Sequence, residues 1–421
     1  MFFGIGSLLH SQTRLSGLQL SLDYYLDAAY KNSPSLKENI NTIRISEIDK
    51  SLVESENLLP QISLTSNYIF SPYFNNGGKI ITTDPGPNAV GYDIGITNGG
   101  LYSAQINLEK NIFNGSTIDA LQNQSDIKIK STRHISDVLK HSIKKDVTEL
   151  YLTTLETQKI YFLSKEIADT IQKQLQLTEN LMKSGQVKQS DYLLLKIESE
   201  NQKLSAEHGY IDFEMNLSEL NTLCGLQDSS SVQLSNIDLQ YVENKNFSKF
   251  LQQFSNDSLL VQNQQSIFET KYSPKISLFF NTGLNAVDLE NIERKFGINA
   301  GINFSLPIYD GNQKSLTRQQ TQISLKTIEA YKENQKIQVS NKIKNANGQI
   351  IFYKQNLKNI SDQVETYGSM MKIAQMELMK GQRSMVEFIT LIKNYLDLKK
   401  NYVSSEIDYL KAINQYNYWN W

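Results

Sequence analysis

Hydrophobic and polar residues alternate along four short stretches of the chain, as they do in β-strands with one buried and one exposed face. The stretches cover about residues 61–71, 103–113, 275–285 and 296–308. In the last of them, "FGINAGINFSLPI", every second residue is apolar and the residues between are Gly, Asn, Ser or Pro. The pattern therefore predicts four strands, each with one apolar and one polar face.

We expect the apolar faces of these strands to contact lipid. Each stretch has at least the roughly 9–11 residues that a tilted transmembrane strand needs. The opposite faces carry mostly small uncharged side chains, which suit a water-filled lumen. The predicted lipid-facing residues are Ile62, Leu64, Tyr68, Phe70, Ile106, Leu108, Leu278, Phe280, Ile298, Ile302 and Phe304.

Two long regions without proline follow the strand pairs, at residues 116–184 and 312–380. Apolar residues recur in them at spacings of three and four, the pattern of a packed helix. A continuous helix of that length would span about 100 Å at ~1.5 Å per residue, far more than a bilayer. Each region turns at a glycine, Gly185 or Gly381, and returns through a second helix. We therefore expect two long helical hairpins standing in water.

The chain is an internal duplication. Gly115 and Gly185 are 70 positions apart, and so are Gly311 and Gly381. The predicted first repeat covers residues 18–240 and the second covers 241–421, each in the order helix, strand, strand, long helical hairpin. The opening helix of the second repeat is expected to be shorter. The fold class is α+β.

Four strands from one chain cannot close a membrane sheet. An open edge in hydrocarbon leaves backbone groups unpaired, at several kcal/mol each. Several copies must therefore share one barrel, and three copies would supply twelve strands.

Composition excludes several kinds of site. The 42 basic and 44 acidic residues nearly balance, so nothing indicates nucleic-acid binding. The single cysteine, Cys224, rules out an internal disulfide, and we expect it to be a buried apolar residue. No stretch approaches the ~18–20 apolar residues of a membrane-spanning helix. Residues 1–17 are interpreted as a possible signal segment, or alternatively as a disordered N-terminus.

No catalytic or cofactor-binding pattern emerges from the chain. His134 and His141 are seven residues apart, which is a weak spacing for a metal site. Glycine-rich stretches lack the Lys-Ser/Thr that completes a phosphate-binding loop. No Ser-His-Asp or paired-carboxylate context suggests a hydrolase. We expect a protein without enzymatic activity, metal or cofactor.

The sequence resembles the TolC-type outer membrane efflux proteins from about Leu20 onward. The matching segments are "NSPSL" at 32–36, "LP" at 59–60, "LNTLCGL" at 220–226, "LPIYDG" at 306–311 and the two glycine-centred turns. Each is short, but their order, duplication and equal spacing are specific together.

The resemblance implies a homotrimer whose twelve-stranded transmembrane β-barrel continues into a long periplasmic α-helical barrel. Such a channel lies in the Gram-negative outer membrane, in contact with its lipid. It is the exit duct of a tripartite efflux pump or a type I secretion system. A periplasmic adaptor, also called a membrane fusion protein, and an inner-membrane transporter are the implied partners.

The resemblance also assigns roles at the two hairpin tips. Alignment on the tip glycines places Arg383, Glu387 and Asp191 at positions that close the periplasmic gate, with Asp191 a candidate partner of Arg383. Thr390 replaces an acidic residue that some members use for a cation-binding ring. The expected adaptor-docking tips are Gly185, Gln186, Val187, Gly381, Gln382, Ser384 and Met385.

A second interpretation keeps the helices but not the membrane. The chain would then be a soluble structural coiled-coil protein whose four strands form a small sheet. The uncharged polar faces count against it, because a soluble sheet more often carries Lys, Glu or Arg outward.

Overall fold

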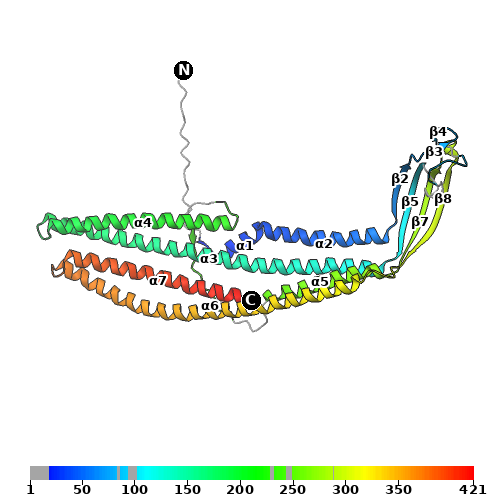
Figure 1. Cartoon of the computed structure of the whole chain (residues 1–421). Helices are drawn as coiled ribbons and strands as arrows, with labels where there is room; N and C mark the ends of the chain where they lie inside the picture. The colour runs from blue at the N-terminus through cyan, green and yellow to red at the C-terminus, as the bar shows by residue number, and fades with distance from the viewer. Residues whose placement is uncertain (1–18, 83–85, 93–101, 228–231, 243–248, 288) are drawn as a thin grey trace, which may run out of the picture. The chain divides into compact units, whose positions relative to one another are not determined.

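The computed structural model describes residues 19–82, 86–92, 102–227, 232–242, 249–287 and 289–421. The possible signal segment and part of the loop after the first strand lie outside these ranges. The chain divides into two compact units (Figure 1). The first comprises the chain up to Asn39, His134–Gln252 and Lys332–Trp421, and the second comprises Ile40–Arg133 and Gln253–Tyr331.

Seven α-helices make up most of the described chain. They are α1 (Leu22–Asn32), α2 (Pro34–Leu58), α3 (Gly115–Lys183), α4 (Gln189–Leu223), α5 (Gln252–Glu269), α6 (Gln313–Met379) and α7 (Met385–Trp419). Short 3₁₀ turns cover Lys249–Leu251, Thr270–Tyr272 and Ile292–Arg294. Helices α3 and α6 have 69 and 67 residues, and their return helices α4 and α7 have 35 each.

The long helix and its return helix thus have nearly the same lengths in the two halves of the chain. Helix α5 has 18 residues, against 25 in α2. Among the described helices, none combines the length and apolar character needed to cross a membrane.

The four predicted strands form one antiparallel sheet in the second unit. In the order β2-β5-β7-β8, the strands are β2 (Gln61–Tyr68), β5 (Tyr102–Phe113), β7 (Lys275–Ala286) and β8 (Phe296–Ser305). Each repeat supplies one strand pair, and β5 and β7 join the two repeats. Figure 1 shows the strands side by side in this order. Strands β2 and β8 are the edges of the sheet.

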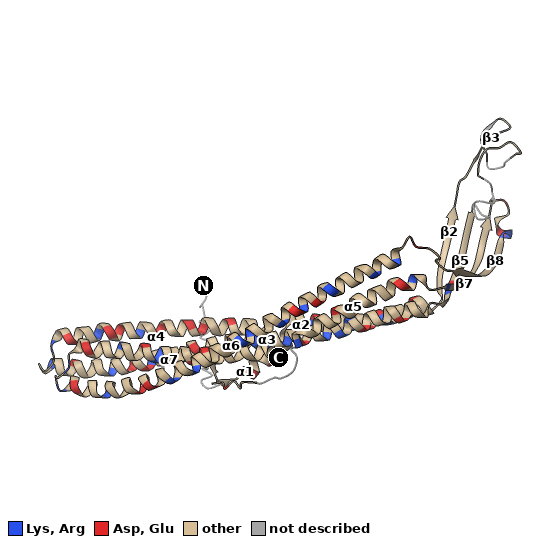
Figure 2. Cartoon of the chain, turned by 60° about the horizontal axis from the view of Figure 1, so that its bottom comes forward, with Lys and Arg blue, Asp and Glu red and all other residues tan. Residues whose placement is uncertain are grey.

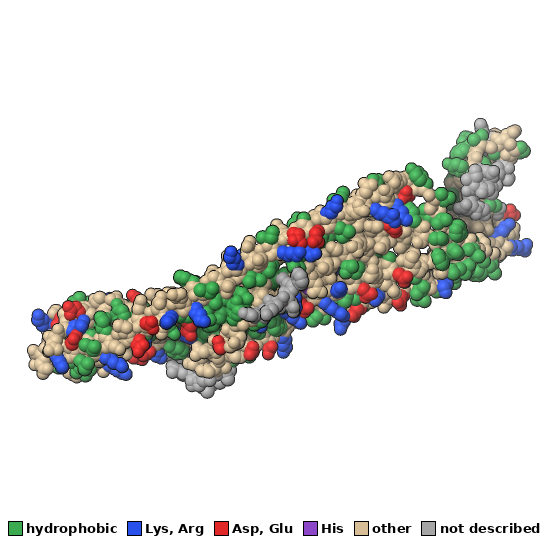
Figure 3. All heavy atoms as spheres, turned by 90° about the horizontal axis from the view of Figure 1, so that it is seen from below, with side chains coloured by type: hydrophobic (Ala, Val, Ile, Leu, Met, Phe, Trp, Pro, Cys, Tyr) green, Lys and Arg blue, Asp and Glu red, His purple; other side chains and the backbone are tan. Residues whose placement is uncertain are grey.

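The register of the strands gathers the apolar residues on one face. Across the sheet, Ile62 lies opposite Leu108, which lies opposite Phe280. The next row joins Leu64 and Ile106. Ile62, Leu64, Tyr68, Ile298, Ile302 and Phe304 are each 65–74% exposed, Ile106 is 50%, Leu278 and Phe280 are near 40%, and Leu108 is half-buried. The alternation predicted for each strand thus produces one continuous apolar surface, visible as hydrophobic side chains gathered over the sheet in Figure 3.

The opposite face is polar and almost uncharged. One row across it joins Ser63, Asn107, Asn281 and Asn299. Glu109 and Lys275 are the charged residues on this face, whereas Lys110 lies on the apolar face opposite Leu278; all three are near the strand ends that adjoin helices. Figure 2 shows that charges occur along the helices and are sparse on the sheet.

Phe279 is the bulky exception on the polar face. It lies opposite Gly301 on β8, where an added Cβ would be 2.5 Å from its ring. Glycine at 301 therefore makes room for an aromatic ring lying across the neighbouring strand.

Three expectations about the strands need correction. Strand β2 ends at Tyr68 rather than residue 71, so Phe70 is exposed but lies beyond the strand. Its neighbour β5 starts at Tyr102, the partner of Tyr68, and no described residue pairs further along. Strand β8 ends at Ser305 rather than 308, because Pro307 cannot donate to a ladder.

The expected loop after β2 contains a hairpin, β3 (Tyr73–Asn76) and β4 (Lys79–Thr82), whose two-residue Gly77–Gly78 turn is a common hairpin signal.

The first unit has its core where α1, α3, α4 and α7 meet. Tyr25, Tyr151, Leu220, Cys224 and Ile407 are all fully buried there, which confirms the expectation for the cysteine. A small parallel pair, β1 (Gln19–Leu20) with β6 (Gln233–Leu234), covers this core. Gln158 secures the pair by donating to the Leu234 carbonyl and accepting from its N–H, at 3.0 and 2.7 Å.

A charged network joins α5 to α6 in the second unit. The Glu269 carboxylate accepts two hydrogen bonds from Arg318, at 2.8 and 2.9 Å, and a third from Gln265 at 2.9 Å. The bonds from Arg318 and then Gln265 lower the pKa of Glu269 to about 2, so it stays ionised near neutral pH. Nearby, the Tyr272 hydroxyl donates to Asp310. At the matching place in the first repeat, Asn114 donates to Asn57.

Candidate functional site

The two hairpin tips have the same backbone geometry. At the first, Gln186 N–H donates to Leu181 O at 2.9 Å and Gly185 N–H to Met182 O at 3.0 Å. At the second, Gln382 N–H donates to Glu377 O at 2.9 Å and Gly381 N–H to Leu378 O at 3.0 Å. These pairs of bonds close each long helix as a Schellman motif. Gly185 and Gly381 have φ of 75° and 70°, a conformation that disfavours any side chain.

The two tips differ in the side-chain bonds that stabilise them. Ser384 caps α7 and forms a capping box with Glu387, whose carboxylate accepts from the Ser384 N–H at 3.3 Å. Arg383 donates to Glu377 at the end of α6, at 2.8–2.9 Å. At the first tip, the N-cap of α4 is Lys188, which makes no side-chain cap bond. Ser184 donates to the Asn180 and Leu181 carbonyls at the end of α3, at 3.2 and 3.0 Å. The return helix therefore has a side-chain N-cap at the second tip, whereas at the first tip the side-chain bonds lie on the end of the long helix.

This asymmetry gives a prediction for stability. Ser384→Ala should lower the free energy of unfolding by about 1 kcal/mol, because an orphan N–H of α7 loses its acceptor. Lys188→Ser should raise it by a similar or smaller amount, and Lys188→Ala should change it little. Denaturant unfolding followed by far-UV circular dichroism measures all three. Equal effects of alanine at 384 and 188 would contradict the role of the cap.

The three predicted gate residues lie at these tips, but they do not contact one another within the chain. Arg383 pairs with Glu377 rather than with Asp191, and Glu387 takes part in the capping box. Asp191 lies in the first turn of α4, half-buried, and its carboxylate has no ion pair among the residues described. The acidic partner Glu377 was not foreseen, because it precedes the tip glycine that anchored the alignment.

The residues predicted to form the docking surface are exposed at most positions, and their role in docking stays a prediction. Gly185, Gln186, Gly381, Gln382 and Ser384 are exposed and Val187 is half-buried. Met385 is a correction, since it is only 5% exposed. Its side chain packs with Phe388, Leu391 and residues of α3, because the first turn of α7 faces the other helices. Met385 therefore belongs to the core beneath the tip.

A buried ion pair joins the two hairpins behind the tips. Glu198 of α4 is 3% exposed and lies 2.9 Å from the Lys393 ammonium of α7. Its other oxygen accepts from Gln202 at 2.8 Å. The hydrophobic cluster around it draws on α3, α4, α6 and α7. Sequence analysis missed this pair, because a single acid on a helix gives no signal that distinguishes it from a solvated one.

The histidines do not form a metal site. His134 is buried in α3, whereas His141 stacks between the rings of Tyr418 and Trp421, at centroid distances of 5.0 and 4.2 Å. Across the described residues, no group of three His, Cys, Asp or Glu side chains could hold a metal ion.

No protein-family model and no curated protein matches the sequence. Solved structures match it along nearly its whole length. The Campylobacter jejuni CmeC outer membrane channel has 15% identity and a TM-score of 0.66, covering 94% of this chain and 86% of that one. The Neisseria gonorrhoeae MtrE outer membrane channel has 12% identity and a TM-score of 0.69, covering 95% and 88%. CusC, whose structures concern transmembrane channel formation, has 10% identity and a TM-score of 0.72, covering 96% and 92%. The chain therefore has the fold of these outer membrane channels, which confirms at the level of the fold the resemblance to TolC-type proteins.

Proposed function

We propose that three copies of this chain form an exit duct through the outer membrane of a Gram-negative cell. The sheets would build a barrel in the membrane and the helical hairpins would extend into the periplasm. The duct would be passive and would serve a tripartite efflux pump or a type I secretion system. The exposed apolar face of the sheet, in a chain with an outer-membrane-channel fold, carries the proposal.

The sheet edges favour closure by further copies. Strands β2 and β8 are the two edges and run in opposite directions, since the four antiparallel strands alternate. Edge β8 of one copy can therefore pair antiparallel with edge β2 of the next. Closure removes the unpaired backbone groups that hydrocarbon does not tolerate. Three chains give the even strand number typical of such barrels.

The return helix α4 also has an uncovered stripe. Leu194, Ile197, Leu204, Ile211 and Met215 recur at spacings of three, four and seven and are 40–66% exposed. Apolar residues at such spacings form the contact face of a helix against another helix. Packing of this stripe against a neighbouring copy would extend the assembly along the helices.

The tips are the proposed point of control. The turns at Gly185 and Gly381 are exposed, and the adaptor would bind to them. The adaptor would couple the duct to the inner-membrane transporter. In the closed assembly, Arg383 would release Glu377 of its own chain and form an ion pair with Asp191 of the next copy. An exposed ion pair contributes roughly 0.2–1 kcal/mol, so three of them could be opened by an adaptor that prefers the open state.

Substitutions at the second tip should change conductance in opposite directions. Arg383→Ser removes the proposed closing contact and should raise single-channel conductance in planar bilayers. Glu377→Gln frees Arg383 from its own chain and should lower it. Lys183→Ser is the matched control, because Lys183 pairs only with Glu179 on its own helix, at 2.8 Å. Unchanged conductance in both tip variants would argue against this gate.

The mass and location of the native assembly test the duct itself. A trimer extracted by detergent from the outer-membrane fraction, sized by light scattering, is the expected result. A soluble monomer or dimer would favour the structural coiled-coil protein instead.

A further inference from the structure

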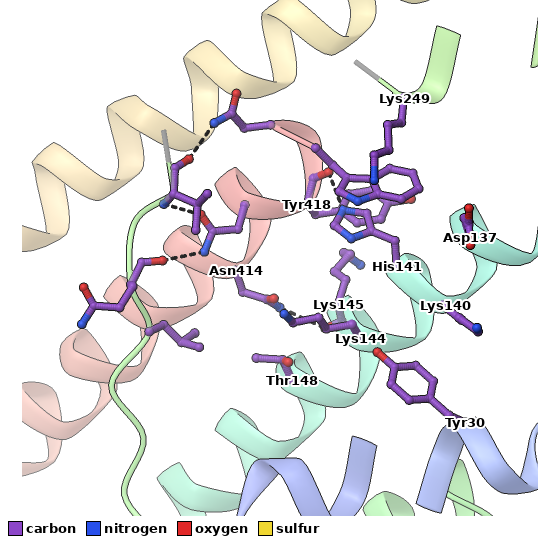
Figure 4. Close-up of a pocket in the computed structure, with 16 residues that line it drawn as sticks. Tyr30, Asp137, Lys140, His141, Lys144, Lys145, Thr148, Lys249, Asn414 and Tyr418 are labelled. Carbon is purple, nitrogen blue, oxygen red and sulfur yellow. Dashed lines mark hydrogen bonds between the residues drawn. The ribbon is translucent and has the colours of Figure 1, made fainter. Parts of the chain in front are cut away.

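A pocket of about 770 Å³ lies within the first unit, apart from the tips. Its walls come from α3, the end of α7 and the segment 239–242, with Tyr30 and Lys249 at its margin (Figure 4). Neither the hairpin tips nor the apolar sheet face uses these residues.

The lining is strongly basic. Lys140, Lys144 and Lys145 of α3 and Lys249 line it, against one acidic side chain, that of Asp137. Lys145 is paired with Asp146 at 2.9 Å. Lys249 lies 4.6 Å from the centre of the Trp421 ring. Lys140 and Lys144 are exposed, and no described carboxylate lies within ion-pair distance of either. The lysine side chains that line the pocket therefore outnumber the acidic ones.

Hydrogen bonds hold one wall of the pocket in place. Asn417 accepts from the Val242 N–H at 3.0 Å and donates to Gln240 O at 2.8 Å. Asn420 donates to Val242 O at 2.7 Å, and the Lys249 N–H donates to Trp421 O at 3.0 Å. These bonds tie the segment and Lys249 to the end of α7, so the wall is formed before any ligand binds.

A buried hydroxyl in the lining lacks a partner. Thr148 of α3 is only 1% exposed, and its Oγ1 has no hydrogen-bond partner in the described structure. Most buried polar groups are hydrogen-bonded, since an unmade bond costs about 1–3 kcal/mol. A ligand oxygen in the pocket would supply the missing partner.

His141 contributes a wall rather than a charge. Its Nε2 lies 2.9 Å from the Tyr418 carbonyl, and its ring lies between two aromatic rings (Figure 4). Burial lowers its pKa, so the ring is neutral near pH 7. The attraction for anions thus comes from the lysines that line the pocket.

We propose that this pocket binds a small molecule carrying two or more phosphate groups. Lysine ammonium groups are compact point charges that suit tetrahedral phosphate, whereas planar carboxylates are better matched by arginine, which the pocket lacks. Lys140, Lys144 and Lys249 would neutralise the charge and Thr148 would donate a hydrogen bond. This binding would occur whether or not the chain forms a duct.

Intrinsic fluorescence offers a direct readout. The sequence has two tryptophans, Trp419 and Trp421, and Trp421 lines the pocket. In a Trp419→Phe background, inorganic triphosphate should change the emission of Trp421 saturably, and more salt should weaken the affinity. Lys140→Gln with Lys144→Gln should weaken it at least about 10-fold. Thr148→Val should weaken it roughly 5-fold without lowering stability. Lys203→Gln, an exposed lysine of α4 outside the pocket, is the control.

Two further probes identify the source of the phosphate. Tighter binding of triphosphate than of dihexanoylglycerol pyrophosphate would support a soluble phosphate ester, and the reverse order would support a lipid headgroup that carries two phosphates. No saturable change with either probe would overturn the proposal. So would affinities that are the same in the Lys140/Lys144 and Lys203 variants.

Discussion

Ile298→Arg should largely abolish assembly of the protein in the outer membrane. Ile298 is 71% exposed on the apolar face of β8, in the row that joins Leu64, Ile106 and Thr282 near the middle of the sheet. Arginine at the midplane of a membrane barrel costs about 2–4 kcal/mol, because its charge must leave water. In a trimer the penalty would apply once in every chain. The measurement is the urea midpoint for folding into dilauroyl phosphatidylcholine vesicles.

The adjacent residue is the matched control. Asn299 is the next residue on β8 and faces the polar side opposite Asn281. Asn299→Arg should insert nearly as well as the native chain, because its charge would lie in water. If Asn299→Arg failed to insert and Ile298→Arg succeeded, the two faces would be reversed. Normal insertion of both would mean that the sheet does not meet lipid.

The sheet was largely predictable because each strand carries its pattern in its own sequence. Alternation in "FGINAGINFS" identifies the faces of β8 without knowledge of any other strand. The order β2-β5-β7-β8 needed the structure, since pairing across the two repeats leaves no mark in either strand. The ends of β2 and β8 were misplaced by up to three residues, because alternation continues past the last paired residue.

The tips were predictable as turns, because glycine in a long helical pattern marks a break. Their side chains were not. Met385 looked exposed by its place beside a turn, yet the first turn of α7 already faces the core. The sequence alignment paired Arg383 with Asp191. In the chain, Arg383 instead bonds to Glu377, six residues before it. Such pairings depend on how two helix ends approach each other, which spacing alone does not specify.

Lys393→Ala should destabilise the four-helix region behind the tips by about 2–3 kcal/mol. The substitution leaves the carboxylate of Glu198, which is 3% exposed, without its counter-charge. Breaking a fully buried ion pair costs about 3–5 kcal/mol. We expect a smaller cost here because the Lys393 side chain is half-exposed, so water can reach the Glu198 carboxylate once the lysine is removed. The denaturant midpoint of the detergent-solubilised protein measures the effect.

A second substitution separates the buried charge from lost packing. Glu198→Gln in the Lys393→Ala background should recover most of the stability, because the amide needs no counter-ion and can still bond to Gln202. Lys196→Ala is the control. Lys196 is an exposed lysine of α4, two residues before Glu198, and no ion pair of its side chain is described. If the double variant were no more stable than Lys393→Ala alone, packing of the lysine stem rather than charge would hold α4 to α7. Complete recovery would mean that the uncompensated carboxylate is the whole cost of Lys393→Ala, and that a neutral residue at 198 holds α4 to α7 as well as the ion pair does.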